Sequence, residues 1–332
     1  MNQQSVITEE FTRIPFIEKE VEINGVAKIF GTITVPSTPN ENEKFPAVLF
    51  ISGSGPLDRN GNGPKGKYKF NLYKELAEFI GGMGFVTFRY DKRGTGSSKE
   101  TLLVSGLWDF VADAECSYTY LQQHSNVDPE RIIVLGHSEG TIIGTALSER
   151  QKLGGLMLLA GGVANLDEYL KHQRKLAYQE LKNSKGIKGL LMRMLVIEEK
   201  EEKKVEKLMQ KMGESNRDVY KAMFLFKQPA KWLREHYSYD PRKALRQVTC
   251  PVLAIQGDKD PLVDNIHLNE LSSLVQGTSD IHIIKDMEHG LRIQKEDKSI
   301  LKVKKLNKSI QSRPLSPDGL NAISHWLISN YK

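Results

Sequence analysis

A serine lies in a glycine-framed turn that is suited to nucleophilic chemistry. The segment GHSEG at 136–140 follows an aliphatic run at 132–135 and precedes apolar residues at helical spacing over 141–147. In a G-x-S-x-G turn between a buried strand and a helix, the glycines let neighbouring backbones approach and the serine hydroxyl stays accessible. An ordinary Gly/Ser turn would also fit these five letters. The strand, turn and helix order favours a nucleophile, and Ser138 is the predicted one.

A serine hydroxyl needs a base that takes its proton and a carboxylate that orients the base. Of the eight histidines, His289 directly follows a strand expected at 281–284. We predict that it is the base, whereas His137, inside the turn, is expected to point away from Ser138. A strand expected at 252–255 is followed by Asp258 and Asp260. We assign the orienting role to Asp260, with Asp258 as the alternative and a simple helix-capping turn as the non-catalytic interpretation.

Acyl transfer also requires hydrogen-bond donors for the developing oxyanion. The backbone N–H of Glu139, immediately after the nucleophile, is one expected donor. The second is expected to be the N–H of Ser54, in the loop SGSGP that follows a strand at 46–51. Gly53 and Gly55 of this loop are expected to border the substrate.

The elements that must position these residues alternate along the chain. Strands are expected at 46–51, 85–90, 132–135, 156–159, 252–255 and 281–284, with helices at 71–80, 107–122 and 317–328. Residues 17–35 predict two antiparallel strands turning at Asn24-Gly25. This order predicts an α/β fold, with a mostly parallel central sheet that helices cover on both faces.

One long segment interrupts the alternation. Residues 163–248 carry no strand pattern and are rich in charged residues with scattered Leu, Met and aromatic residues. We therefore divide the chain into a core at 1–162, a helical cap or lid at 163–248 and the rest of the core at 249–332. The cap is expected over the carboxyl ends of the strands, where such sheets bind ligands. Met223, Phe224 and Phe226 are expected to bind substrate, although packing within the cap is the alternative.

Composition limits the kinds of binding partner and the cellular location that are expected. The net charge of +6 is concentrated in the cap and in the segment 292–313, which favours solvated helix faces over a nucleic-acid groove. Neither a secretory signal nor a membrane-spanning stretch is visible, so a cytoplasmic protein is expected. The two cysteines, Cys116 and Cys250, are interpreted as reduced thiols. The segment at 61–68 nearly matches a phosphate-binding loop, but Pro64 removes an amide and Tyr68 replaces the magnesium-binding hydroxyl, which argues against nucleotide binding.

The motifs together resemble those of a known superfamily. The GHSEG turn, the turn Gly257-x-x-Asp260 and His289, in this order, make nearly the whole chain similar to the α/β hydrolases. The loop at 52–56 with Asp58-Arg59-Asn60-Gly61 resembles bacterial EstD-type carboxylesterases, and the turn at 91–98 is similar to the one after the superfamily's fourth strand. The resemblance implies an α/β-hydrolase fold with a cap between the sixth and seventh strands. Ser52 stands where many lipases have histidine, and the basic segment 292–313 has no counterpart that explains it.

These observations predict a serine hydrolase that cleaves small carboxylic esters through an acyl-Ser138 intermediate. No metal and no cofactor is expected. A thioesterase, a peptidase or an acyltransferase would use the same triad. Of these, a peptidase is disfavoured because the expected cap is helical and is not a separate propeller domain. A ligand-binding protein on a hydrolase scaffold, with an inactive serine, is the alternative from another class.

Overall fold

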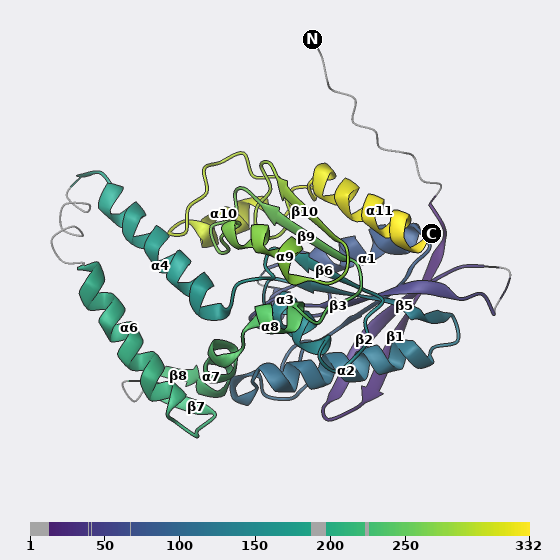
Figure 1. Cartoon of the computed structure of the whole chain (residues 1–332), viewed down its shortest axis with the longest axis horizontal. Coiled ribbons are helices and arrows are strands. Elements are labelled where there is room, and N and C mark those ends of the chain that lie inside the picture. The colour runs from purple at the N-terminus through teal and green to yellow at the C-terminus, as the bar shows by residue number, and fades with distance from the viewer. Residues whose placement is uncertain (1–12, 39, 41, 67, 187–196, 223–225) are drawn as a thin grey trace, which may run out of the picture.

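A large central sheet organises the chain in a computed structural model that describes residues 13–38, 40, 42–66, 68–186, 197–222 and 226–332. The sheet has eight strands in the order β1-β2-β4-β3-β5-β6-β9-β10 (Figure 1). Their bounds are β1 Phe16–Asn24, β2 Lys28–Pro36, β3 Phe45–Ile51, β4 Val86–Tyr90, β5 Val127–His137, β6 Gly155–Leu159, β9 Val252–Gly257 and β10 Ser279–Ile284. The β1–β2 and β2–β4 pairs are antiparallel and the other pairs are parallel. The predicted α/β-hydrolase sheet is confirmed.

The strand sequences explain their places in the sheet. Every residue of β3 (FPAVLFI) is buried, as expected for a continuous apolar run covered on both faces. The edge strand β1 instead has no fully buried residue, and its half-buried and exposed positions alternate only over its last five residues. Because β3 pairs in parallel with β5, the loops that follow these two strands meet at one edge of the sheet.

Helices pack on both faces of the sheet. One apolar cluster joins α1 (Leu72–Gly82) and α11 (Pro317–Tyr331) to one face, and the other joins α2 (Leu107–Gln123) and α3 (Glu139–Leu147) to the opposite face. The helix expected at 71–80 runs two residues further, through Gly81 and Gly82. The turn comes at Gly84, whose φ of 85° is the left-handed conformation that glycine adopts after a helix.

The segment between β6 and β9 forms, in its described part, the helices α4 (Leu166–Asn183), α6 (Glu198–Gly213), α7 (Ala230–Ser238) and α8 (Pro241–Leu245). Of these, α4 and α6 extend away from the sheet (Figure 1), whereas α8 packs into the same apolar cluster as α3. The expectation that this segment has no strands is wrong, because β7 (Val219–Ala222) and β8 (Phe226–Pro229) pair as a hairpin. Each strand has only four residues, too few to produce a recognisable alternation.

Two short helices complete the carboxyl-terminal part. They are α9 (Leu271–Leu274) and α10 (Val303–Ile310), the latter within the basic segment 292–313. Among the helices in the described ranges, none has the length and apolar character needed to cross a membrane.

Candidate active site

Ser138 lies at the junction of β5 and α3 with an unusual backbone conformation. Its φ of 54° and ψ of −120° are rarely adopted by residues other than glycine, so the fold holds this residue under strain. A Cβ on Gly136 would collide with the backbone of Gly140, and one on Gly140 would collide with the carbonyl of Ile51. The two glycines therefore let the turn close tightly against β3, as the motif predicts.

Three residues that are far apart in the sequence meet at this turn. Nε2 of His289 lies 2.9 Å from Oγ of Ser138, and Nδ1 of His289 lies 2.7 Å from Oδ2 of Asp260. Because a carboxylate only accepts, the Nδ1 proton of His289 is donated to Asp260. In the neutral ring Nε2 is then free to accept the serine proton. Burial lowers the pKa of His289, but the charge of Asp260 and its hydrogen bond more than offset this and raise the pKa above 6.5.

The side chain of Asp260 is itself held by several donors. It is 2% exposed, its Oδ2 also accepts from the Gln256 amide at 2.8 Å, and its Oδ1 accepts from the backbone N–H of Leu262 at 2.7 Å. Asp258 faces another way, since its Oδ1 accepts from the backbone N–H of Asp286 at 2.8 Å. Of the two aspartates, Asp260 is the one in contact with His289.

The glycine-rich loop after β3 packs directly against the nucleophile. A Cβ on Gly53 would lie 3.1 Å from the Cβ of Ser138, so only glycine lets the loop come this close. Within the described residues, neither the backbone N–H of Ser54 nor that of Glu139 donates a hydrogen bond. Both groups are thus available for an oxyanion at Ser138.

His137 does not contact Ser138 but connects neighbouring loops. Its Nε2 lies 2.8 Å from the carbonyl oxygen of His289, and its Nδ1 lies 3.0 Å from the hydroxyl of Tyr73. That hydroxyl accepts the backbone N–H of Gly53 at 2.8 Å. Burial lowers the pKa of His137 to about 3, so the ring is neutral. Nothing in the sequence around Tyr73, which lies in the first turn of α1, indicates that its hydroxyl would contact the site.

A buried cluster of charges lies on the other side of the loop. Lys92, just after β4, donates to the carbonyl oxygen of Gly53 at 2.6 Å and to Oε2 of Glu139 at 2.8 Å. The second oxygen of Glu139 accepts from the indole of Trp232 and lies 3.1 Å from Nε2 of His236, both on α7. Burial raises the pKa of Glu139, but Lys92 and His236 bring it well below its usual range. The side chain of Glu139 thus joins the turn at 136–140 to α7.

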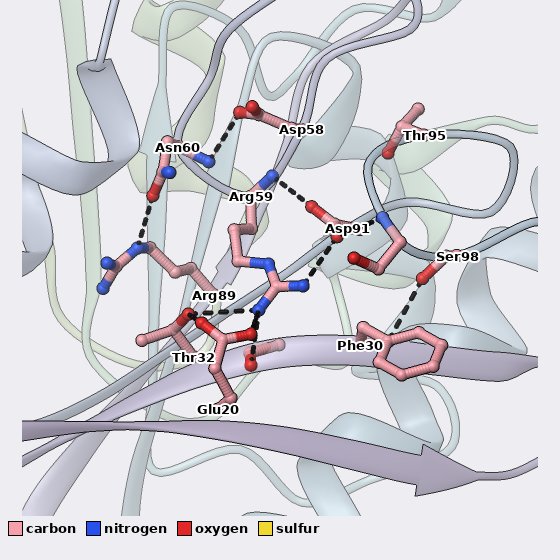
Figure 2. Close-up of polar contacts among 12 residues, drawn as sticks. Glu20, Phe30, Thr32, Asp58, Arg59, Asn60, Arg89, Asp91, Thr95 and Ser98 are labelled. Carbon is pink, nitrogen blue, oxygen red and sulfur yellow. Dashed lines mark hydrogen bonds and ion pairs between the residues drawn. The ribbon is translucent and has the colours of Figure 1, made fainter.

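Figure 2 shows how the base of the same loop is anchored. The guanidinium of Arg59 bonds to Oδ2 of Asp91 at 2.8 Å, and the backbone N–H of Arg59 bonds to Oδ1 of Asp91 at 2.7 Å. Arg59 also contacts Glu20 of β1 and donates to the carbonyl oxygen of Gly31 of β2 at 2.7 Å. The two motifs noted in the sequence, at 58–61 and 91–98, therefore interlock and brace the loop that carries Ser54.

A pocket of about 200 Å³ opens at Ser138. It is lined by Gly53, Ser54, Leu57, Gly61, Phe70, Leu72, Tyr73, His137, Ser138, Leu262, Glu288, His289, Gly290, Arg292, Asn307 and Ile310. Gly55, expected to border the substrate, is not among these described lining residues. Met223 and Phe224 lie outside the described residues, as does the side chain of Phe226.

The basic segment 292–313 contributes to this pocket. Asn307 and Ile310 of α10 line it, and Arg292 holds the segment on α1 by bonding to Glu75 at 2.8 Å. The amphipathic spacing of α10 was a signal in the sequence, but nothing local indicated which surface it covers. In the described part of the chain, no cluster of three or more His, Cys, Asp or Glu residues could hold a metal ion, and Cys116 and Cys250 are not paired.

The chain is similar in sequence and in fold to known esterases. The chain is 28% identical over 289 residues to the esterase EstD of Thermotoga maritima, covering 86% of this chain and 62% of EstD. It therefore spans less than two thirds of that relative.

Two solved structures share the fold. One is Est1E from Butyrivibrio proteoclasticus with ferulic acid bound, which has a TM-score of 0.55 and 17% identity over 87% of this chain and 96% of that chain. The other is a thermophilic esterase from Thermogutta terrifontis, which has a TM-score of 0.53 and 18% identity over 95% of this chain and 100% of that chain. The family described as serine aminopeptidase, S33, matches residues 68–296, a range that contains Ser138, Asp260 and His289. The chain therefore belongs to this family of α/β hydrolases.

Proposed function

We propose that this chain is a carboxylesterase-type serine hydrolase that cleaves small carboxylic esters through an acyl intermediate on Ser138. The observation that carries the proposal is the continuous contact from Ser138 through His289 to Asp260, with Ser138 and His289 in the lining of a pocket. The similarity to EstD supports esters as the substrate class.

In the first step, Oγ of Ser138 attacks the ester carbonyl carbon while Nε2 of His289 takes the hydroxyl proton. The charge of Asp260 stabilises the imidazolium that results. The carbonyl oxygen becomes an oxyanion, and the N–H groups of Ser54 and Glu139 are its proposed donors. Since both are backbone groups of a rigid turn, they need little rearrangement as the charge develops.

In the second step, the bond between the carbonyl carbon and the alcohol oxygen breaks. His289 returns its proton to the leaving alkoxide, and the acyl group stays on Ser138. A water molecule then attacks the acyl carbon while His289 takes its proton. The bond from the acyl carbon to Oγ of Ser138 breaks, His289 returns the proton to Oγ, and the carboxylic acid leaves. The chemistry requires only side chains and backbone groups of this chain, so we propose that it needs no metal or cofactor.

The pocket lining supports a small, uncharged acyl or aryl group. Leu57, Phe70, Leu262 and Ile310 present apolar surface. An aminopeptidase must bind a free ammonium group, which calls for an accessible carboxylate. Glu288, the one carboxylate among the described lining residues, is 5% exposed and accepts the backbone N–H of Arg292 at 3.0 Å. The lining therefore favours esters over amino-terminal peptides.

We also propose that residues 163–248 form a cap that contributes to substrate selection. The contacts of Trp232 and His236 with Glu139 support this, because they place α7 against the residue that follows the nucleophile.

A Ser138→Ala variant tests the proposed chemistry. Hydrolysis of a short aryl ester should fall by several orders of magnitude, to background, since the nucleophile is lost. A fluorophosphonate probe should label the wild type at Ser138 and leave the variant unlabelled. An aryl thioester and an amino-acid anilide, assayed beside the ester, separate the alternative activities. More than a few per cent residual ester turnover, or an unlabelled wild type, would contradict the proposal.

A further inference from the structure

The ammonium group of Lys92 lies against the loop that carries the proposed oxyanion donor. Its Nζ is 2.6 Å from the carbonyl oxygen of Gly53, and the whole residue is only 3% exposed. The ring of Phe110 covers it, with its centroid 5.1 Å from Nζ. A charge buried this deeply needs partners of its own, and it has a carbonyl, a carboxylate and an aromatic face.

The carbonyl that Lys92 binds belongs to the same peptide group as the proposed donor. The oxygen of Gly53 and the N–H of Ser54 sit on one planar trans peptide, so they point in opposite directions. An ammonium fixed on the oxygen side therefore sets the direction of the N–H on the other side. Hydrogen bonding to the oxygen also polarises the peptide and strengthens the N–H as a donor.

We propose that Lys92 is a positioning residue for the oxyanion hole: it orients and polarises the Gly53–Ser54 peptide group, and Glu139 holds it in place. This inference rests on the proposed esterase function. It assigns a role to a lysine that does not reach the substrate, since Lys92 is not among the residues that line the pocket.

Glu139 links this arrangement to the cap. One carboxylate oxygen accepts from Lys92 at 2.8 Å, and the other accepts from the indole N–H of Trp232. The backbone N–H of Glu139 is the other proposed oxyanion donor. A shift of α7 would therefore act, through the side chain of Glu139, on both proposed oxyanion donors, the N–H groups of Ser54 and Glu139.

The turn that carries Lys92 is itself anchored. Asp91, the preceding residue, accepts the backbone N–H and the guanidinium of Arg59, as Figure 2 shows. Of the two polar contacts that the ammonium group of Lys92 makes among the described residues, the bond to the Gly53 carbonyl at 2.6 Å is the one that reaches the proposed oxyanion loop, and the inference rests on it.

The test compares Lys92→Met with Lys332→Met. Lys332 also donates to a glycine carbonyl (Gly84, 3.2 Å) and lies over a phenylalanine ring (Phe85, centroid at 5.4 Å), but it is not among the residues that line the pocket. The kcat and KM for a short aryl ester are measured for each variant. Inhibition constants are measured for a trifluoromethyl ketone, which forms an oxyanion on Ser138, and for the matching methyl ketone, a carbonyl that stays trigonal.

Lys92→Met should lower kcat roughly 10- to 100-fold, somewhat less than the loss of an oxyanion donor itself, with little change in KM. The trifluoromethyl ketone should bind more weakly by a similar factor, and the methyl ketone should be unaffected. Lys332→Met should behave as the wild type. An unchanged kcat and ketone affinity, or a change confined to KM, would overturn the inference.

Loss of folding would not leave the question open. Lys92→Met with Glu139→Gln removes both charges of the pair, which avoids an unpaired buried carboxylate. The same loss of kcat and of ketone affinity is expected in this double variant, and wild-type values in it would overturn the inference. Failure of the proposed function is recognised separately, because the wild type would then neither hydrolyse the ester nor react with the fluorophosphonate.

Discussion

The hydroxyl of Tyr73 lies 3.0 Å from Nδ1 of His137 and accepts the backbone N–H of Gly53 at 2.8 Å. A carbonyl oxygen can only accept, so Nε2 of His137 donates to His289, and the neutral ring accepts the Tyr73 proton at Nδ1. The donor and the acceptor of each of these three hydrogen bonds are therefore determined. The chain connects the loop of Gly53 with the backbone of the proposed base.

Tyr73→Phe should break this connection. Gly53 loses the acceptor of its N–H and His137 loses a donor, so we expect kcat for an aryl ester to fall roughly tenfold, with a cost of about 1–3 kcal/mol in stability for the buried unpaired groups. Tyr331→Phe is the matched control, because its hydroxyl bonds to the carbonyl of Gly154, away from the pocket. Similar kcat values in both variants would contradict the positioning role.

The acid of the triad is tested by comparing two neighbouring aspartates. Asp260→Asn should reduce turnover by roughly 10⁴, because the amide favours the wrong tautomer of His289. Asp258→Asn should have a small effect, since Asp258 bonds to the backbone of Asp286. The measurement is kcat on one ester for both variants, and the reverse ranking would assign the role to Asp258.

The pH dependence of kcat/KM should follow the protonation of His289. The base must be neutral to accept the serine proton, and its pKa is raised above 6.5 because Asp260 and Glu288 outweigh burial. Activity should therefore decline as the pH falls through a value above 6.5. A pH profile with a stable, non-ionising ester measures this limb. An acidic limb below 6.5 would be inconsistent with the environment of His289.

The contribution of α10 to selectivity is tested at Ile310, which is 1% exposed and lines the pocket. Ile310→Ala should enlarge the pocket and shift the preference in a series of esters toward longer acyl chains. Lys308→Ala, on the exposed side of α10, is the control.

The same series of esters on a variant with Met223, Phe224 and Phe226 changed to Ala tests the proposed cap. A variant whose chain-length profile is unchanged has lost no substrate contact.

The anchor beneath the loop should matter for stability. Arg59→Met leaves Asp91, 2% exposed, without its guanidinium partner, and we expect a loss of about 3–5 kcal/mol in the free energy of unfolding. Lys171→Met removes an exposed pair with Asp167 on α4 and should cost less than about 1 kcal/mol. Urea denaturation of both variants measures the difference. Equal losses would mean that Arg59 does not brace the loop.

Much of the site could be predicted because its signals are local. Gly136 is required because a Cβ there would overlap the backbone of Gly140, a few residues further on, and a buried strand needs a continuous aliphatic run. His289 and Asp260 each follow such a strand. Since parallel strands end at the same edge of a sheet, their order alone indicated that these residues could meet.

Other features depend on contacts between distant segments. Nothing in the sequence indicated the side-chain contacts of Lys92, Tyr73 and Glu139, which form because β3, β4 and β5 are neighbours in the sheet. The β7–β8 hairpin is too short for its alternation to be recognised.

The sequence by itself determined the elbow, the chain order of Ser138, Asp260 and His289, and the alternation of strands and helices, because each depends on local sterics or on the periodicity of burial. Only the tertiary structure decided which aspartate contacts His289, that Lys92 binds the Gly53 carbonyl, and that α10 lines the pocket. These contacts join segments up to hundreds of residues apart, and they form only when the packing of the whole sheet brings the loops together.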